Sequence, residues 1–153
     1  MRSEGFHTLL LALVVVGVVG WTTALVAAPY VLAHPDPATG VAFAATGTYL
    51  AASLVCHQLP ERSFHPWARK LPVCARCAGL YGGALGGLLL VPWPAGARRT
   101  RAVIAAAAIP TVATFLLESV GVWDPGNAIR FAAALPLGAS VAWFVANAAR
   151  GVV

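Results

Sequence analysis

The chain has 153 residues, of which 59% are hydrophobic and only 10% are charged, and its formal net charge is +5. Soluble domains carry about 25% charged residues, so this composition excludes a soluble globular protein. The positive charge does not indicate nucleic-acid binding, because the basic residues lie in short gaps between apolar runs, as they do in membrane proteins. The sequence therefore predicts a single membrane domain over residues 1–153.

Five apolar runs follow one another along the chain. The first, Thr8–Ala33, is longer than the apolar core of a signal peptide, and Pro29 directly follows the candidate cleavage sequence VAA, so we expect a retained helix. The other runs are Thr39–Cys56, Ala78–Val91, Arg101–Val120 and Ala128–Ala149. Because backbone groups in lipid must pair with one another, the predicted fold is an all-α, polytopic bundle of about five transmembrane helices. The prolines at positions 29, 110 and 136 should kink these helices without ending them.

The third run carries a face of small residues. Gly79, Gly83 and Gly87 form a GxxxGxxxG pattern, which lets two helices approach closely in lipid. This face predicts tight packing inside the bundle, and the alternative is a homo-oligomer formed through the same glycines.

Five spans would bring the polar motifs to one membrane face. That face would hold the N-terminus, the segment 57–77 and the segment 121–127. A count of basic residues by the positive-inside rule favours a cytoplasmic location for this face. It would carry Arg2, Arg62, Arg69, Lys70, Arg76 and Arg130, against Arg98, Arg99, Arg101 and Arg150 on the other face.

All three cysteines of the chain lie within one polar stretch, CHQLPERSFHPWARKLPVCARC. Zinc prefers four thiolate or imidazole ligands in tetrahedral geometry. Cys56, Cys74 and Cys77, with His57 or His65, offer such a Cys3His set. Zinc is the default ion for these ligands, and another thiophilic metal centre, with copper(I) or iron–sulfur, is the alternative.

The CxxC motif also permits thiol chemistry. Cys74 and Cys77 lie where the third helix is expected to begin, and Arg76 stands between them. A helix N-terminus and nearby cations stabilise a thiolate. A membrane thiol-disulfide protein that uses this pair is therefore a second hypothesis, and a purely structural role for the cysteines is a third.

Arginines near the same face offer another possibility. Arg62, Arg76 and Arg130 could form a pocket for a small anion or a lipid head group. Asn127 precedes Arg130 by three residues and is a candidate N-cap of the fifth helix. Glu118, near a membrane end, could pair with Arg130 or reach water.

Three segments resemble a known family. CHQLPERSF, LPVCARCAGLYGG and DPGNAIRFAAALPLG are similar to the motifs of the small prokaryotic membrane proteins called domain of unknown function 2085. The resemblance covers residues 54–138 and implies a helical integral membrane protein of the prokaryotic cell membrane. Its motif positions are Cys56, His57, Gln58, Arg62, Ser63, Cys74, Arg76, Cys77, Gly79, Tyr81, Asn127 and Arg130.

The functional hypothesis drawn from the sequence is a small multi-pass membrane protein whose Cys/His cluster binds a metal ion in a structural or sensing role. The sequence contains no P-loop, serine triad, paired glycosidase carboxylates or HExxH motif, and it does not require the protein to be an enzyme. The partner that it does predict is the lipid bilayer.

Overall fold

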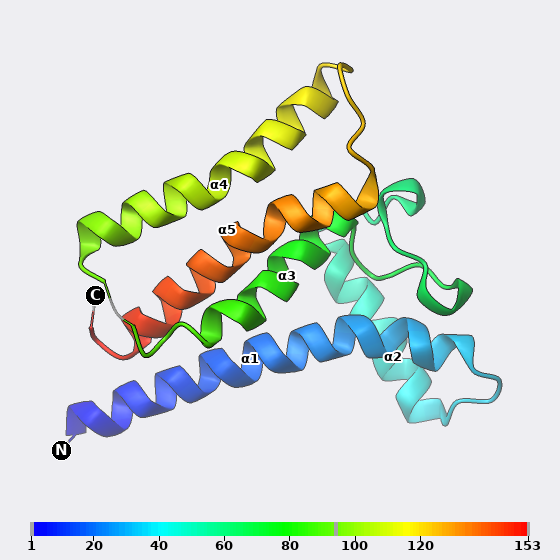
Figure 1. Cartoon of the computed structure of the whole chain (residues 1–153). Coiled ribbons are helices and arrows are strands. Elements are labelled where there is room, and N and C mark those ends of the chain that lie inside the picture. The colour runs from blue at the N-terminus through cyan, green and yellow to red at the C-terminus, as the bar shows by residue number, and fades with distance from the viewer. Residues whose placement is uncertain (1, 94, 153) are drawn as a thin grey trace.

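The computed structural model describes residues 2–93 and 95–152 and is built from helices (Figure 1). No strand forms within these residues, which confirms the all-α prediction. The segment between α2 and α3 also contains two single turns of 3-10 helix, η1 (Pro60–Arg62) and η2 (Pro66–Ala68). The α-helices are α1 (Arg2–Ala33), α2 (Thr39–Ser53), α3 (Ala75–Leu88), α4 (Ala97–Ser119) and α5 (Gly126–Ala149).

Each helix matches one of the five predicted apolar runs. The largest shift is in α1, which begins at Arg2, six residues before its predicted start at Thr8, and the bounds of the other helices differ from the prediction by at most four residues. Pro29, Pro110 and Pro136 lie inside α1, α4 and α5 as expected. These helices continue through proline because a bilayer offers the backbone no better hydrogen-bonding partner than its own helix.

Three of the five helices are long and apolar enough to cross a membrane. These are α1 over Glu4–Ala33, with 30 residues, α4 with 23 and α5 with 24. Helix α2 has 15 residues and α3 has 14. At a rise of 1.5 Å per residue each extends only about 21–23 Å, which is short of a hydrocarbon core of about 30 Å.

The small residues of α3 pack against α5. A Cβ atom added at Gly79, Gly83 or Gly87 would overlap the backbone carbonyl oxygen of Phe131, Leu135 or Ala139, respectively. Gly138 of α5 lies equally close to the backbone of α3. The prediction of tight packing within the bundle is confirmed. A homo-oligomer formed through the same glycines would have to displace α5.

The molecule has two distinct ends, which we call the loop end and the terminal end (Figure 1). At the terminal end, His7 near the start of α1 contacts the carbonyl oxygen of Ala149 through Nδ1 at 2.9 Å. At the loop end, the ring of Tyr30 near the end of α1 lies 5.3 Å from that of Trp67. Helix α1 therefore runs from the terminal end to the segment between α2 and α3.

The predicted sidedness of the N-terminus is wrong. The start of α1 and the end of α5 both lie at the terminal end, and the cysteine-bearing segment lies at the loop end (Figure 1). The reason is that α2 does not return to the start of α1. It runs obliquely beside the last turns of α1, where Ala52 packs with Leu25. The chain therefore crosses between the ends along α1, α3 with its following turn, α4 and α5.

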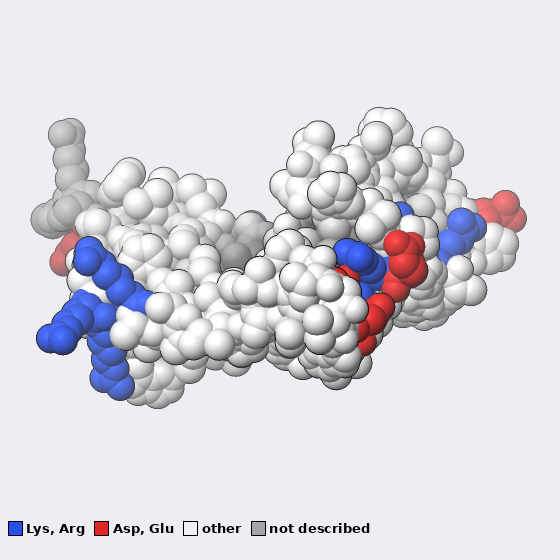
Figure 2. Space-filling model, turned by 90° about the horizontal axis from the view of Figure 1, so that it is seen from above, with Lys and Arg blue, Asp and Glu red and all other residues white. Residues whose placement is uncertain are grey.

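The position of α1 in the structure changes how the basic residues divide between the two ends of the molecule. Arg2 begins α1 and so moves to the terminal end, which leaves five basic residues at each end. The count no longer favours a cytoplasmic location for the cysteines. Charge is nevertheless distributed unevenly, since basic side chains cluster together at the terminal end and mix with acidic ones at the loop end (Figure 2).

Candidate metal centre and the neighbouring ion-pair network

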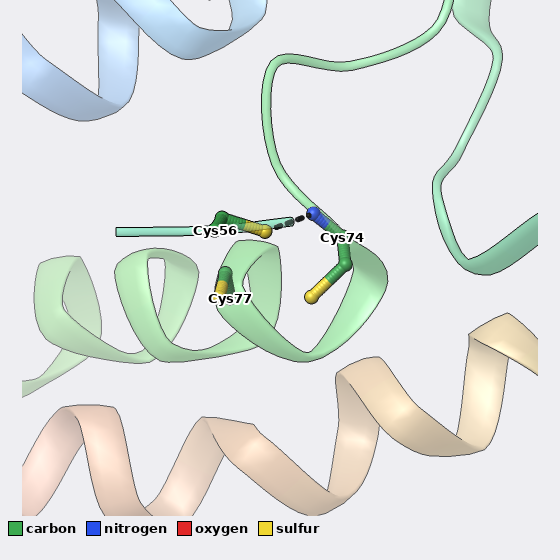
Figure 3. Close-up of side chains that lie close together, drawn as sticks. All are labelled: Cys56, Cys74 and Cys77. Carbon is green, nitrogen blue, oxygen red and sulfur yellow. Dashed lines mark hydrogen bonds between the residues drawn. The ribbon is translucent and has the colours of Figure 1, made fainter. Parts of the chain in front are cut away.

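The three cysteines come together at the loop end (Figure 3). Their sulfur atoms all lie within 4.8 Å of one another, although Cys56 is separated from the CxxC pair by a long loop. Cys56 is buried, whereas Cys74 and Cys77 are half-buried, and none forms a disulfide. The predicted convergence of the three thiols on one place is thus present in the structure.

Local backbone geometry explains why the sulfur atoms converge. Helix α2 ends at Ser53, and the chain continues in a further turn in which the amide of Cys56 donates to the carbonyl of Ala52 at 3.0 Å. Cys74 immediately precedes α3, and its amide donates to the sulfur of Cys56 at 3.2 Å. Cys77 lies one turn into α3, on the side of Cys74, because residues three apart share a helix face.

Apolar packing holds the sulfur of Cys56 in place. Leu25 of α1, Ala52 of α2 and Val73 form a buried cluster with Cys56. Trp21 packs against this cluster, as do Cys74 and Cys77 themselves. Side chains from α1, α2 and α3 therefore pack around the buried side chain of Cys56.

The open side of the thiol group faces a pocket of about 150 Å³. All three cysteines line this pocket, together with His57, Gln58 and Arg62. Of the two predicted histidine ligands, only His57 lines it, and its side chain is exposed. His65 is also exposed and belongs to the residues that precede η2. Neither imidazole lies as close to the sulfur atoms as these lie to one another.

The contact between the CxxC thiols changes the acidity of one of them. A hydrogen bond from the side chain of Cys77 lowers the pKa of the Cys74 thiol to about 5, and further hydrogen bonds from Cys56 and from the backbone act in the same direction. Burial opposes them. The lowered pKa favours the thiolate form of Cys74, which is the form that binds a metal ion or acts as a nucleophile.

Hydrogen bonds fold the loop between α2 and α3 independently of the thiols. The side chain of Gln58 donates to the carbonyl of Tyr49 at 2.7 Å, and Lys70 donates to the carbonyl of Gln58 at 2.6 Å. The hydroxyl of Tyr49 in turn donates to the carbonyl of Lys70. These contacts stabilise the left-handed backbone conformation of Gln58, whose φ is 51°.

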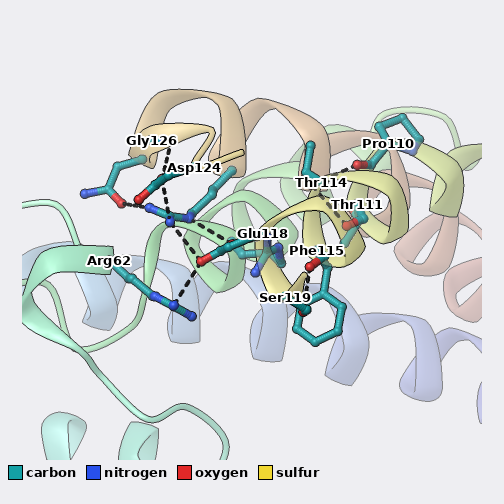
Figure 4. Close-up of polar contacts among 12 residues, drawn as sticks. Arg62, Pro110, Thr111, Thr114, Phe115, Glu118, Ser119, Asp124 and Gly126 are labelled. Carbon is teal, nitrogen blue, oxygen red and sulfur yellow. Dashed lines mark hydrogen bonds and ion pairs between the residues drawn. The ribbon is translucent and has the colours of Figure 1, made fainter. Parts of the chain in front are cut away.

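An ion-pair network lies beside the thiol group, at the end of α4 (Figure 4). Its centre is Glu118, whose side chain is only 8% exposed. Arg130 contacts both carboxylate oxygens, with Nη2 at 2.8 Å from Oε1 and Nε at 3.3 Å from Oε2. Arg62 and Arg76 each approach the same carboxylate at 3.1 Å. Arg76 also lies over the ring of Phe115, at 5.5 Å from its centroid.

The convergence of Arg62, Arg76 and Arg130 was expected for an anion pocket, and these residues do converge. The anion that they contact in the structure is the carboxylate of Glu118. Arg130 makes a second ion pair, with Asp124 at 2.8 Å. Two carboxylates thus offset much of the positive charge of the three guanidinium groups.

Asn127 links the network to the loop, and its predicted role as an N-cap is wrong. Helix α5 begins at Gly126, so Asn127 lies inside its first turn. The amide of Gly126 donates a hydrogen bond to Oδ1 of Asp124 at 2.9 Å. The side chain of Asn127 instead donates to the carbonyl of Ser63 at 3.1 Å and accepts from Arg130 at 3.2 Å. It therefore joins α5 to the chain that follows η1.

Glu118 has more partners in the structure than its sequence context predicts. The sequence predicts that Glu118 either pairs with Arg130 or reaches water, whereas in the structure it binds arginines from the loop, from α3 and from α5. One signal was available, because a carboxylate within an apolar, membrane-spanning helix is costly and calls for a partner. The number of those partners depends on tertiary packing, which the sequence does not reveal.

The chain is similar to a family of membrane proteins and to two archaeal proteins. The family described as predicted membrane protein (DUF2085) matches residues 56–144, which include the three cysteines and the ion-pair network. An uncharacterized protein of Methanocaldococcus jannaschii is 31% identical over 101 residues, which cover 63% of this chain and 65% of that protein. Another uncharacterized protein, from Methanothermobacter thermautotrophicus, is 33% identical over 94 residues, which cover 58% of this chain and 81% of that protein.

The matched region spans just under two thirds of the length of the Methanocaldococcus jannaschii protein. No solved structure shows significant similarity to the chain. The family match begins at Cys56, so α1 and α2 lie outside it.

Proposed function

Because the chain belongs to the DUF2085 family of predicted membrane proteins, we propose that it is a multi-pass membrane protein that binds one thiophilic metal ion through Cys56, Cys74 and Cys77. The role of the ion is structural or sensing, and zinc is the default ion. The observation that carries the proposal is the mutual approach of three sulfur atoms to within 4.8 Å.

The spacing of the sulfur atoms supports metal binding. A zinc–sulfur bond of about 2.3 Å places two thiolates of a tetrahedral site about 3.8 Å apart. Sulfur atoms already within 4.8 Å need only small side-chain movements to reach this geometry. The amide of Cys74, which donates to the sulfur of Cys56, would also stabilise negative charge on that ligand.

His57 is the proposed fourth ligand. It lines the same pocket as the three cysteines, and its exposed side chain has room to turn inward. Zinc favours four ligands, and imidazole is a common companion of three thiolates. With copper(I), the three thiolates alone form a suitable soft ligand set, and His57 would remain free.

The hydrogen-bonded loop bears on the role of the ion. Contacts of Gln58, Lys70 and Asn127 hold the loop to its neighbours without using a thiol. The three thiols therefore lie close together before a metal binds, which lowers the ordering entropy that binding must overcome. This arrangement supports an ion that binds to a folded protein and adds stability to it.

Elemental analysis of the detergent-purified protein and of a Cys74→Ser/Cys77→Ser variant tests the proposal, combined with anaerobic thiol titration. About one equivalent of metal in the wild type, lost in the variant, supports it. Thiols that react with an alkylating reagent only after a chelator is added support it further. Absence of metal from protein purified and reconstituted with zinc or copper(I) would overturn it.

Thiol-disulfide exchange is a second candidate function, supported by the lowered pKa of Cys74. In this reaction the Cys74 thiolate attacks a partner disulfide and forms a mixed disulfide. This attack releases the first partner sulfur as a thiolate, which accepts the proton of the Cys77 thiol. Cys77 then attacks the sulfur of Cys74 and displaces the partner's second sulfur, which leaves as a thiolate, so two electrons pass to the partner and a Cys74–Cys77 disulfide remains. In the same experiment, this function predicts no metal and two additional titratable thiols after reduction.

A further inference from the structure

A groove lies at the terminal end, between α4 and the α3–α5 pair and far from the cysteines. Its volume is about 690 Å³. The residues that line it are almost all apolar and come from three parts of the chain: Leu90, Trp93, Val103, Ala107, Pro136 and Trp143. Small residues such as Ala107 keep the space between the helices open.

The polar groups of the apolar wall already have partners. The indole nitrogen of Trp143 donates to the carbonyl of Trp93 at 3.0 Å, and the hydroxyl of Ser140 donates to the carbonyl of Leu137 at 3.0 Å. An occupant of the groove would therefore find apolar surface and few groups to hydrogen bond. A lipid acyl chain meets this condition, whereas a polar solute does not.

The mouth of the groove is positively charged. Arg99 lines both the groove and a shallow neighbouring depression, which Arg98 also lines. Arg101 is exposed beside them, and within the described part of the chain no acidic side chain lies within ion-pairing distance of these three arginines. Figure 2 shows the resulting cluster of basic side chains. Guanidinium groups bind phosphate by charge-assisted hydrogen bonds.

We propose that this groove binds one anionic phospholipid, whose acyl chain lies along Val103 and Ala107 and whose phosphate is bound by Arg99. Charge complementarity selects the lipid class, because the head group reaches a cluster of arginines that has no carboxylate partner. A zwitterionic lipid would carry its own positive charge into this cluster and would bind less tightly. The site is independent of the proposed metal centre, which lies at the other end of the molecule.

Native mass spectrometry of the purified, full-length protein tests this inference, with phosphatidylglycerol and phosphatidylcholine of the same acyl chains added separately. We expect one phosphatidylglycerol to remain bound, at least tenfold more tightly than phosphatidylcholine. Arg99→Gln should weaken phosphatidylglycerol binding roughly tenfold, because it removes a charge-assisted hydrogen bond. Arg69→Gln, which changes an exposed arginine at the loop end, is the matched control and should have no effect.

A second variant tests the apolar half of the site. Ala107→Phe fills the groove and should also weaken phosphatidylglycerol binding, while retaining the helical circular dichroism spectrum. Equal retention of the two lipids would overturn the proposal, as would equal effects of Arg99→Gln and Arg69→Gln. Displacement of the lipid by millimolar inorganic phosphate would also overturn it, since the arginines would then bind a free anion without using the groove.

Discussion

Arg130 and Glu118 form a bidentate ion pair, in which Nη2 lies 2.8 Å from Oε1 and Nε lies 3.3 Å from Oε2. The side chain of Arg130 is 4% exposed and that of Glu118 is 8% exposed. This pair joins the end of α4 to the start of α5. Through Arg62 and Arg76 it also reaches the loop and the CxxC helix, so it supports the position of the thiol group.

Glu118→Gln should destabilise the protein strongly. The substitution preserves the shape of the side chain but leaves the buried charge of Arg130 without its main partner. Breaking a buried ion pair by removing one charge costs about 3–5 kcal/mol of unfolding free energy. Thermal unfolding in detergent, followed by circular dichroism, measures the effect.

Asp124→Asn is the matched control for this prediction. Asp124 contacts the same guanidinium at the same distance of 2.8 Å, but its side chain is 75% exposed. An ion pair with such an exposed partner contributes about 0–1 kcal/mol. If both variants unfold at the same temperature, burial of Glu118 is not what makes its ion pair important.

Gly83→Ala should weaken the packing of α3 against α5. The added Cβ would overlap the carbonyl oxygen of Leu135, so the helices must separate, at a cost of about 1–3 kcal/mol. In Gly86→Ala the Cβ points into open space, and replacing glycine in a helix should then stabilise the protein by up to about 1 kcal/mol. Opposite shifts in unfolding temperature are expected, and equal shifts would contradict the observed α3–α5 contact.

The two chain termini should lie on the same side of the membrane. His7 and Ala149 are in direct contact, and this requires an even number of crossings between them. Reporter fusions that are active on only one side, placed at the N-terminus in one protein and at the C-terminus in another, measure the sidedness. Reporters on opposite sides would indicate an odd number of crossings and would contradict the contact between His7 and Ala149.

His57 and His65 should differ in their effect on zinc binding. His57 lines the pocket of the three thiols, and His65 does not. His57→Ala should therefore lower the affinity for zinc roughly tenfold or more, whereas His65→Ala should leave it unchanged. Competition with a chromogenic chelator gives both affinities. A larger effect at His65 would mean that the loop rearranges around the metal.

Removal of the metal should leave the helical fold intact. The loop is held by Lys70, Asn127 and other residues that are not ligands. A bound ion still adds stability by mass action, which amounts to about 4 kcal/mol when its concentration is a thousand times the dissociation constant. After chelation we expect an unchanged circular dichroism spectrum at low temperature and a lower unfolding temperature. Loss of the spectrum itself would identify the ion as necessary for folding.

The sequence alone determined the membrane character and the helical fold. Long apolar runs admit no other solution in lipid, because each backbone donor must find its acceptor within the same segment. The motifs CHQ and CARC also placed the thiols correctly near helix ends, since a polar stretch must leave the hydrocarbon core. These properties are local, and they follow from the order of residues without knowledge of distant contacts.

Only the tertiary structure decided the sidedness of the N-terminus and the role of Glu118. Helix α2 is apolar like the others, but it lies obliquely across α1, and hydropathy does not report the direction of a short helix. Glu118 gathers arginines from positions 62, 76 and 130, which are distant in sequence and meet only because α3 and α5 pack closely through glycine. Such contacts depend on the mutual orientation of whole helices, and side-chain packing determines that orientation.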